Sequence, residues 1–163
     1  MAQSDEPRRP PYGAYAGIMG TFTGGLAAAG LLARRLGRDP RGDSVLDLAV
    51  LSAATFKAAR TIARDDVTSF LRNPFVEGDA GTGENESPAE TGDLHQAIGE
   101  LVTCSRCVGT WAAAGLTTTQ LVAPRFGRLL TWSLAAAGVN DFLQASFAAL
   151  TSKSNELQSR SDA

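Results

Sequence analysis

The uncharged stretch from Tyr12 to Ala33 constrains the fold more than any other part of this chain. A helix of this length crosses about 30 Å of hydrocarbon, and the stretch contains no Asp, Glu, Lys or Arg. It is long for the apolar core of a secretory signal peptide, and it ends in Arg34 and Arg35 without a convincing cleavage site. We therefore expect residues 12–33 to form an uncleaved membrane span.

Four glycines of this stretch share one face of the expected helix. They lie four, three and four residues apart, at Gly13, Gly17, Gly20 and Gly24. In water, each glycine would disfavour the helix by up to ~1 kcal/mol relative to alanine. In a membrane, small residues let another helix backbone approach closely. The glycines are therefore a candidate packing seam, either within this chain or between copies of it.

The rest of the chain alternates polar connections with further apolar stretches. Only about half of the second expected helix is apolar, so it either spans the membrane or lies partly in the interface. The fold class that follows is an all-α integral membrane helical bundle of three or four spans with short interfacial amphipathic helices. The expected segments are a disordered N-terminal tail (1–11), a first helical pair (12–75) with a span (12–33), a second helix (44–64) and a short helix (67–72), an acidic flexible linker (76–93), a segment with two cysteines and the last two spans (94–152), and a polar tail (153–163).

Asp141 lies near the middle of the fourth expected span (129–152), where an unpaired charge costs several kcal/mol. We expect Asn140 and Asp141 to interrupt this span, and the candidate partners of the carboxylate are Lys57 and Arg60 of the second helix. A pair that fixes the register of the helices is one interpretation. The other is functional: a relay for protons or ions, or a polar pocket for a lipid headgroup.

The two cysteines, Cys104 and Cys107, lie three residues apart where the third apolar stretch (107–124) begins. At a helix N-terminus, backbone N–H groups and the helix dipole stabilise a thiolate, and Arg106 between the thiols adds positive charge. A redox dithiol is therefore one interpretation, and inert structural cysteines are another. Quinone-coupled disulfide enzymes of bacterial membranes need a second cysteine pair, which this sequence does not contain.

Zinc binding is the third interpretation of the same cysteines. Structural zinc has four ligands, so the two thiolates would need His95 and Glu100, or a second pair of thiolates from another protomer. The spacing of these residues is not that of a known closed zinc site. No other cofactor is indicated, because the sequence has no Walker A loop, Gly-x-Ser-x-Gly elbow, His-Glu-x-x-His motif or dinucleotide fingerprint.

The charge of the chain excludes one class of partner. Its formal net charge of −2 does not suit a nucleic-acid-binding domain, which needs a concentrated basic surface. The partners that the sequence predicts are the lipid bilayer and either further copies of the chain or another membrane protein. With four spans, nine basic residues fall on the side of the chain ends and six in two short loops on the other side. From this distribution we expect both ends in the cytoplasm.

Two stretches together resemble the signatures of a bacterial protein family. Phe56–Phe75 (FKAARTIARDDVTSFLRNPF) is similar to a pattern of paired bases, an Asp, a hydroxyl residue and Leu-Arg-x-Pro-Phe. Gly99–Trp111 (GELVTCSRCVGTW) resembles Gly-Glu-Leu-Leu-x-Cys-x-x-Cys-x-Gly-x-Trp. The family is the domain of unknown function numbered 1360, which comprises small integral membrane proteins. The matched positions are Arg60, Asp65, Thr68, Arg72, Pro74, Phe75, Glu100, Cys104, Cys107, Gly109 and Trp111.

The resemblance implies membrane residence and a joint role for the two signatures, and it implies no activity. Lys57 and Arg106 depart from the residues usual in the family. We expect a non-enzymatic protein of the bacterial cytoplasmic membrane that crosses it several times and self-assembles or scaffolds a partner. Its bundle would be organised by the polar signature residues, and the small residue after the thiols would allow close helix packing; these positions are Arg60, Asp65, Arg72, Glu100 and Gly109. Two alternatives remain open: a thiol-redox or zinc-binding membrane protein that uses the two cysteines, and a transporter or pore component that uses Asp141 and the glycine stripe.

Overall fold

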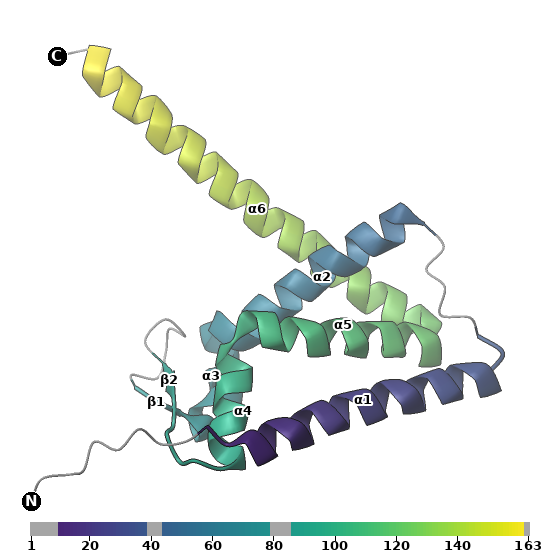
Figure 1. Ribbon diagram of the computed structural model, residues 1–163. Helices are drawn as coiled ribbons and strands as arrows, with labels where there is room; N and C mark the ends of the chain where they lie inside the picture. The colour runs from purple at the N-terminus through teal and green to yellow at the C-terminus, as the bar shows by residue number, and fades with distance from the viewer. Residues whose placement is uncertain (1–9, 39–43, 79–85, 162–163) are drawn as a thin grey trace, which may run out of the picture.

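A computed structural model describes residues 10–38, 44–78 and 86–161, and these are almost entirely helical (Figure 1). The elements, in chain order, are α1 (Tyr12–Arg35), α2 (Val45–Arg64), η1 (Asp66–Thr68), α3 (Ser69–Arg72), η2 (Asn73–Phe75), β1 (Val76–Glu77), β2 (Ser87–Pro88), α4 (Leu94–Thr103), α5 (Ser105–Val122) and α6 (Pro124–Ser161). The all-α class is confirmed for the described residues, apart from the two short strands. Most of the expected N-terminal tail lies outside them.

α2 lies at the centre of the fold, because it packs against both α5 and α6, which also contact each other (Figure 1). The residues buried where these helices meet are mostly small: Ala54 is fully buried in a cluster with Leu116 and Ala135. Gly138 of α6 lies so close to α2 that an added Cβ would be 2.9 Å from the carbonyl oxygen of Ala53. Helices that approach through small residues are typical of membrane bundles.

α1 lies along α5 and α4 and buries little of its surface (Figure 1). It is the one helix of the described chain with both the length and the hydropathy of a membrane span, at 24 residues and a mean hydropathy of 1.5. Its ring contact is with α5, where the centroids of Phe22 and Trp111 are 5.1 Å apart. After α1, Gly37 adopts a φ of 63°, which turns the chain so that the Arg38 side chain donates to the Val122 carbonyl oxygen at 2.7 Å, near the end of α5.

The glycine stripe of α1 does not face the other helices. A Cβ added at any of its glycines would meet no atom within 4 Å; these are Gly13, Gly17, Gly20 and Gly24. They therefore form no packing seam within the described part of the chain, which removes one of the two interpretations made from the sequence. Gly109 of α5 behaves differently, since its added Cβ would lie 3.7 Å from the Ala59 side chain of α2.

The C-terminal region differs most from the sequence-based prediction. Instead of an interrupted span and a polar tail, the structure has one unbroken helix of 38 residues, α6. Pro124 starts this helix rather than ending a span, because the first helical position needs no N–H donor. Asn140 and Asp141 do not interrupt it, since each lowers helix propensity by less than about 0.7 kcal/mol and the Asp141 carboxylate pairs with α2. Near the end, Glu156 pairs with Lys153 and Arg160.

The described ends of the acidic segment 76–93 are ordered, whereas its composition predicts a solvated linker. β1 and β2 pair antiparallel, with Val76 opposite Pro88 and Glu77 opposite Ser87. Glu86, which precedes β2, is buried because it pairs with Arg72. Composition cannot indicate this burial, since the partner lies 14 residues away in a different element. Residues 79–85 of the expected linker lie outside the described residues.

Candidate functional site

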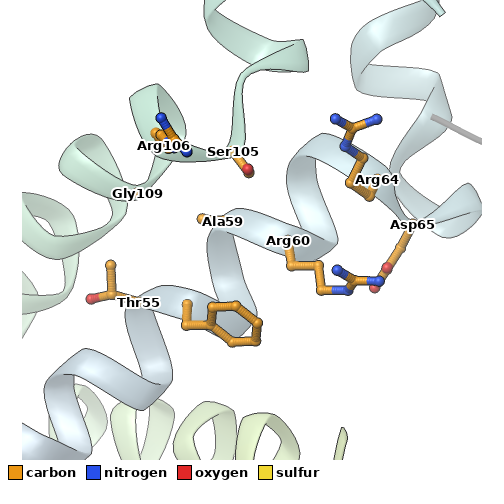
Figure 2. A pocket seen from close by; sticks show the side chains of 9 residues that line it. Thr55, Ala59, Arg60, Arg64, Asp65, Ser105, Arg106 and Gly109 are labelled. Carbon is orange, nitrogen blue, oxygen red and sulfur yellow. The ribbon is translucent and has the colours of Figure 1, made fainter. Parts of the chain in front are cut away.

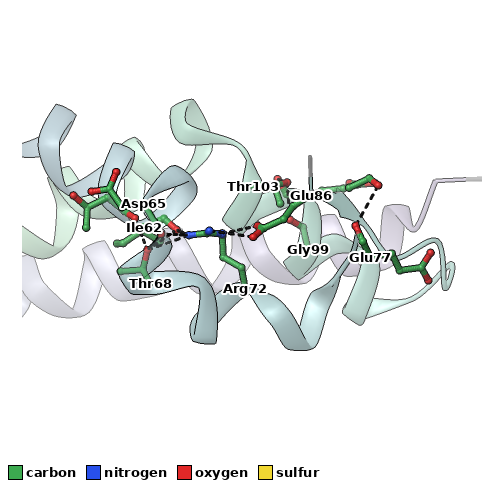
Figure 3. A network of polar contacts seen from close by, with 11 residues as sticks. Ile62, Asp65, Thr68, Arg72, Glu77, Glu86, Gly99 and Thr103 are labelled. Atoms are coloured by element: carbon green, nitrogen blue, oxygen red, sulfur yellow. Dashed lines mark hydrogen bonds and ion pairs between the residues drawn. The ribbon is translucent and has the colours of Figure 1, made fainter. Parts of the chain in front are cut away.

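The first signature closes the C-terminal end of α2 (Figure 3). The fully buried guanidinium of Arg72 donates to the carbonyl oxygens of Ile62 (2.8 Å) and Asp65 (3.0 Å). It also donates to the Thr68 hydroxyl at 3.0 Å, and this hydroxyl donates to the Thr61 carbonyl oxygen. The last carbonyls of a helix have no partner inside the helix. Arg72 and Thr68 therefore satisfy groups that burial would otherwise leave unpaired.

The same guanidinium binds Glu86 through two parallel hydrogen bonds (Figure 3). The Nε–Oε2 distance is 2.6 Å and the Nη2–Oε1 distance is 3.1 Å. The two side chains are 0% and 1% exposed. Bidentate pairing compensates the loss of hydration of both charges. Arg72 thus ties the end of α2 to the strand pair, which is a structural role.

The two signatures meet where η2 lies against α4. His95 donates from Nε2 to the Pro74 carbonyl oxygen at 2.6 Å, and its ring centroid is 5.1 Å from that of Phe75. The Phe75 carbonyl oxygen also accepts from the Ala89 N–H at 3.1 Å. That carbonyl lies against Gly99, where an added Cβ would overlap it. Glycine at this position therefore sets how closely the first signature approaches the second.

α4 and α5 follow one another with a sharp break at Cys104. Asp93 caps the start of α4 by accepting from the His95 N–H at 2.9 Å. The Thr91 hydroxyl and that N–H hold the pKa of the Asp93 carboxyl below its usual value, because both bonds favour the charged form. At the start of α5, the Cys104 sulfur accepts from the Cys107 N–H at 3.3 Å. The second signature is thus also a helix-capping segment.

The thiols of Cys104 and Cys107 are joined in a disulfide within the first turn of α5. Cys107 is exposed and Cys104 is half-buried. Cys107 also lines a mainly apolar cavity of about 420 Å³ between α1, α4 and α5, together with Phe22 and Trp111. Glu100 lies in the same cavity, where its carboxylate accepts from the Tyr15 hydroxyl.

The residues considered for zinc are not brought together. His95 binds the Pro74 carbonyl oxygen, and Glu100 is engaged by Tyr15 and by the Gln96 amide at 2.9 Å. Within the ranges that the structure describes, no three His, Cys, Asp or Glu residues are grouped as a metal ion would require. A site completed by a second protomer stays a prediction.

Asp141 pairs with Lys57, as the sequence predicts. The Lys57 Nζ lies 2.9 Å from Asp141 Oδ2 and 3.7 Å from Asp65 Oδ2, so it bridges α6 and the end of α2. The stacked rings of Phe56 and Phe142, with centroids 5.0 Å apart, flank this bridge. The Lys57 ammonium therefore has two carboxylate partners, one on α6 and one at the end of α2. This arrangement is expected of an ion pair that fixes how α2 and α6 align. Arg60, the other candidate partner, lines the same cavity as Asp141.

Arg60 also lines another cavity, which has a volume of about 820 Å³ and lies between α2 and α5 (Figure 2). Two further arginines line it, Arg64 one turn later on α2 and Arg106 at the start of α5. Asp65 and Ser105 complete its polar wall. The sequence places Arg60 and Asp65 in one signature, but the position of Arg106 beside them depends on the packing of α5 on α2.

Comparison with known proteins gives the chain its family. The family model described as protein of unknown function (DUF1360) matches residues 50–147. The chain is 33% identical over 104 residues to the sporulation protein YjcA of Bacillus subtilis (strain 168), which covers 61% of this chain and 88% of that protein. It is 28% identical over 101 residues to the UPF0713 protein YngL of the same strain, and this match covers 62% of this chain and 78% of YngL. No solved structure matches. Since the family model spans both signatures and three fifths of the sequence, the chain belongs to the DUF1360 family.

Proposed function

We propose that the chain is a multi-pass protein of the bacterial cytoplasmic membrane in which α1, α2, α5 and α6 span the bilayer. Its function would be non-enzymatic: the bundle holds a membrane-facing surface and the two signatures in place for assembly with further copies or with another membrane protein. The observation that carries the proposal is the distribution of apolar residues between the inside and the outside of the fold.

The inside of the described fold is built from small residues and the outside from large apolar ones. Seven of the nine buried apolar residues are alanines. Meanwhile, 24 large apolar side chains are exposed, among them Met19 (62%), Val45 (85%), Phe142 (59%) and Phe147 (72%). In water each of these would forgo about 1.5–3 kcal/mol of burial. In a bilayer they contact lipid tails, while small residues give close helix packing.

The assembly part of the proposal is supported by the surface of α1. A Cβ added at any of its four stripe glycines would meet no atom of the described chain within 4 Å, and Leu26 and Leu31 are 44% and 61% exposed. A surface that combines glycines at helix-packing spacing with large apolar neighbours suits another transmembrane helix. Homo-oligomerisation is the simplest form of such assembly.

Labelling of single cysteines tests the topology. In a Cys104→Ser/Cys107→Ser background, Ala123→Cys lies between α5 and α6, and Ser159→Cys lies near the end of α6. Four spans with both ends in the cytoplasm predict that an impermeant maleimide labels Ala123→Cys in intact spheroplasts and Ser159→Cys only after lysis. Equal labelling of both positions in intact cells would show that α6 does not cross the membrane. Extraction of the protein by alkaline carbonate would reject membrane integration altogether.

A thiol-redox function is the second candidate, favoured by the exposed disulfide with Arg106 beside it. Positive charge and a helix N-terminus both stabilise the thiolate that such exchange requires. Trapping of mixed disulfides in cells with Cys107 kept and Cys104→Ser would identify a thiol partner. Recovery of no cross-linked species would count against this candidate.

The scaffold proposal makes a different prediction for the cysteines. We expect Cys104→Ser/Cys107→Ser to keep the size of the purified assembly in detergent, because the disulfide closes only a short loop within one helical turn. Loss of a disulfide that closes such a short loop should lower the free energy of unfolding by no more than about 2 kcal/mol. Size-exclusion chromatography with light scattering provides the measurement. Dissociation of the double variant into folded protomers would mean that the thiols take part in assembly.

A further inference from the structure

We propose that the cavity between α2 and α5, defined by Phe56, Arg60, Arg64, Asp65, Ser105 and Arg106, binds the phosphate group of an anionic glycerophospholipid. This inference rests on the proposed membrane location. Its chemistry, the recognition of a phosphate ester by guanidinium groups, stands independently of that location. The volume of about 820 Å³ lies within the range of about 300–1,000 Å³ usual for ligand pockets.

The cavity adjoins a close contact between α2 and α5. Ala59 of α2 is buried opposite Gly109 of α5, where an added Cβ would be 3.7 Å from the alanine side chain. The side chains of Arg60 and Ser105 come from the two helices that meet at this contact (Figure 2). The close contact fixes the floor of the cavity, so its polar walls are held by the backbone packing.

Positive charge exceeds negative charge around this cavity. Arg60 and Arg64 lie four residues apart and share a face of α2, and Arg106 is on the first turn of α5. The one carboxylate in the wall is that of Asp65, and the Lys57 ammonium lies 3.7 Å from it. The N-terminal end of α5 adds the positive end of a helix dipole. Guanidinium groups bind phosphate oxygens in pairs, which makes this wall suited to a phosphate anion.

A second cavity, with both polar and apolar walls, leads from the first toward α6 and would take the rest of a lipid molecule. This second cavity of about 410 Å³ adjoins the first and shares Phe56, Arg60 and Asp65 with it, and the ion pair of Lys57 and Asp141 also lines it. Phe142 and Ala145 of α6 line its far side. A ligand with a phosphate among the arginines would therefore place its acyl chains along the ring pair of Phe56 and Phe142 toward the exposed apolar surface of α6.

The position of the cavity along the bundle fits a headgroup. Its lining residues come from the end of α2 and the start of α5, and these helix ends lie beside α3 and α4 (Figure 1). The opposite end of α2 carries Val45, Leu46 and Leu48, all exposed. Basic pockets between membrane helices at the level of the interface are a recurring mode of anionic-lipid recognition.

Lipid binding by the purified protein tests the site. Full-length protein in a neutral detergent is titrated with short-chain phosphatidylglycerol, short-chain phosphatidylcholine and inorganic phosphate, and binding is followed by calorimetry. The wild type should bind phosphatidylglycerol and bind phosphatidylcholine much more weakly. Arg60→Gln/Arg106→Gln, which changes two exposed side chains on opposite walls, should weaken phosphatidylglycerol binding by at least about tenfold. Arg34→Gln/Arg35→Gln removes the same charge at the exposed end of α1 and should bind as the wild type does.

The outcomes distinguish a lipid phosphate from a soluble phosphate compound, and they also show whether the cavity is a specific site at all. Phosphate that competes with phosphatidylglycerol while binding as tightly would assign the cavity to a soluble phosphate compound and overturn its lipid assignment. Equal weakening by both double variants would reduce the effect to general surface charge and overturn the site. Unchanged binding in Arg60→Gln/Arg106→Gln would do the same. Carbonate extraction of the protein from membranes would reject the proposed function separately. It would leave the result of the titration with inorganic phosphate valid.

Discussion

Replacing Arg72 with methionine is expected to lower the free energy of unfolding by about 3–5 kcal/mol, because it leaves a buried carboxylate without its partner. The Glu86 side chain is 1% exposed and has both carboxylate oxygens bound to the Arg72 guanidinium. The carbonyl oxygens of Ile62 and Asp65 at the end of α2 would lose a donor at the same time. Tryptophan fluorescence during denaturation in mixed micelles would measure the change.

Two further variants make this result specific. Lys153→Met breaks an exposed ion pair with Glu156, whose side chains are 60% and 44% exposed, and should change stability by less than about 1 kcal/mol. Arg72→Met/Glu86→Leu removes both buried charges and should recover part of the loss, but not the part due to the helix carbonyls. If Arg72→Met proved as mild as Lys153→Met, the buried pair would not stabilise the fold.

The roles found for Arg72 and Arg60 divide the first signature into two parts. Arg72 and Thr68 are fully engaged by backbone carbonyls of α2 and by Glu86. Arg60, by contrast, is exposed and lines the cavity between α2 and α5, and it belongs to the adjoining cavity as well. One part of the signature thus builds the end of a helix, and the other presents charge on its surface. The proposed phosphate site uses only the second part.

Local signals in the sequence predicted several features correctly. The uncharged stretch from Tyr12 predicted α1, and the second helix expected over 44–64 is α2, where the Ser44 hydroxyl accepts from the Asp47 N–H at 3.1 Å. The pairing of Asp141 with Lys57 followed from the cost of an isolated charge among apolar residues. Each of these depends on a few neighbouring residues or on a single strong energetic constraint.

Features that depend on distant packing could not be predicted. Glu86 is one of several acids between residues 77 and 93, and nothing local distinguishes it as the buried partner of Arg72. The unbroken course of α6 past Asn140 depends on its contact with α2, which outweighs a small loss of helix propensity. The Gly-Glu-Leu stretch predicted that Gly99 belongs to a motif. Its contact with the Phe75 carbonyl depends on the packing of α4 against η2, which no local pattern indicates.

Substitution of Gly99 by alanine tests that contact and should destabilise the protein by about 1–3 kcal/mol. The added Cβ would overlap the Phe75 carbonyl oxygen and lie 3.3 Å from the Pro88 Cβ, so backbone atoms of η2 must move. This cost opposes the gain in helix propensity of up to about 1 kcal/mol that alanine brings inside a helix. Loss of the contact would also separate the two signatures.

Gly115→Ala is the matched control, because Gly115 lies inside α5 and its added Cβ would meet no atom within 4 Å. The same chemical change should there stabilise the protein by up to about 1 kcal/mol, through helix propensity alone. The two variants are therefore expected to shift the unfolding midpoint in opposite directions in the same micelle. Stabilisation by both would mean that α4 does not lie against η2 at Phe75, since the Phe75 carbonyl oxygen is the atom that a Cβ at Gly99 would overlap.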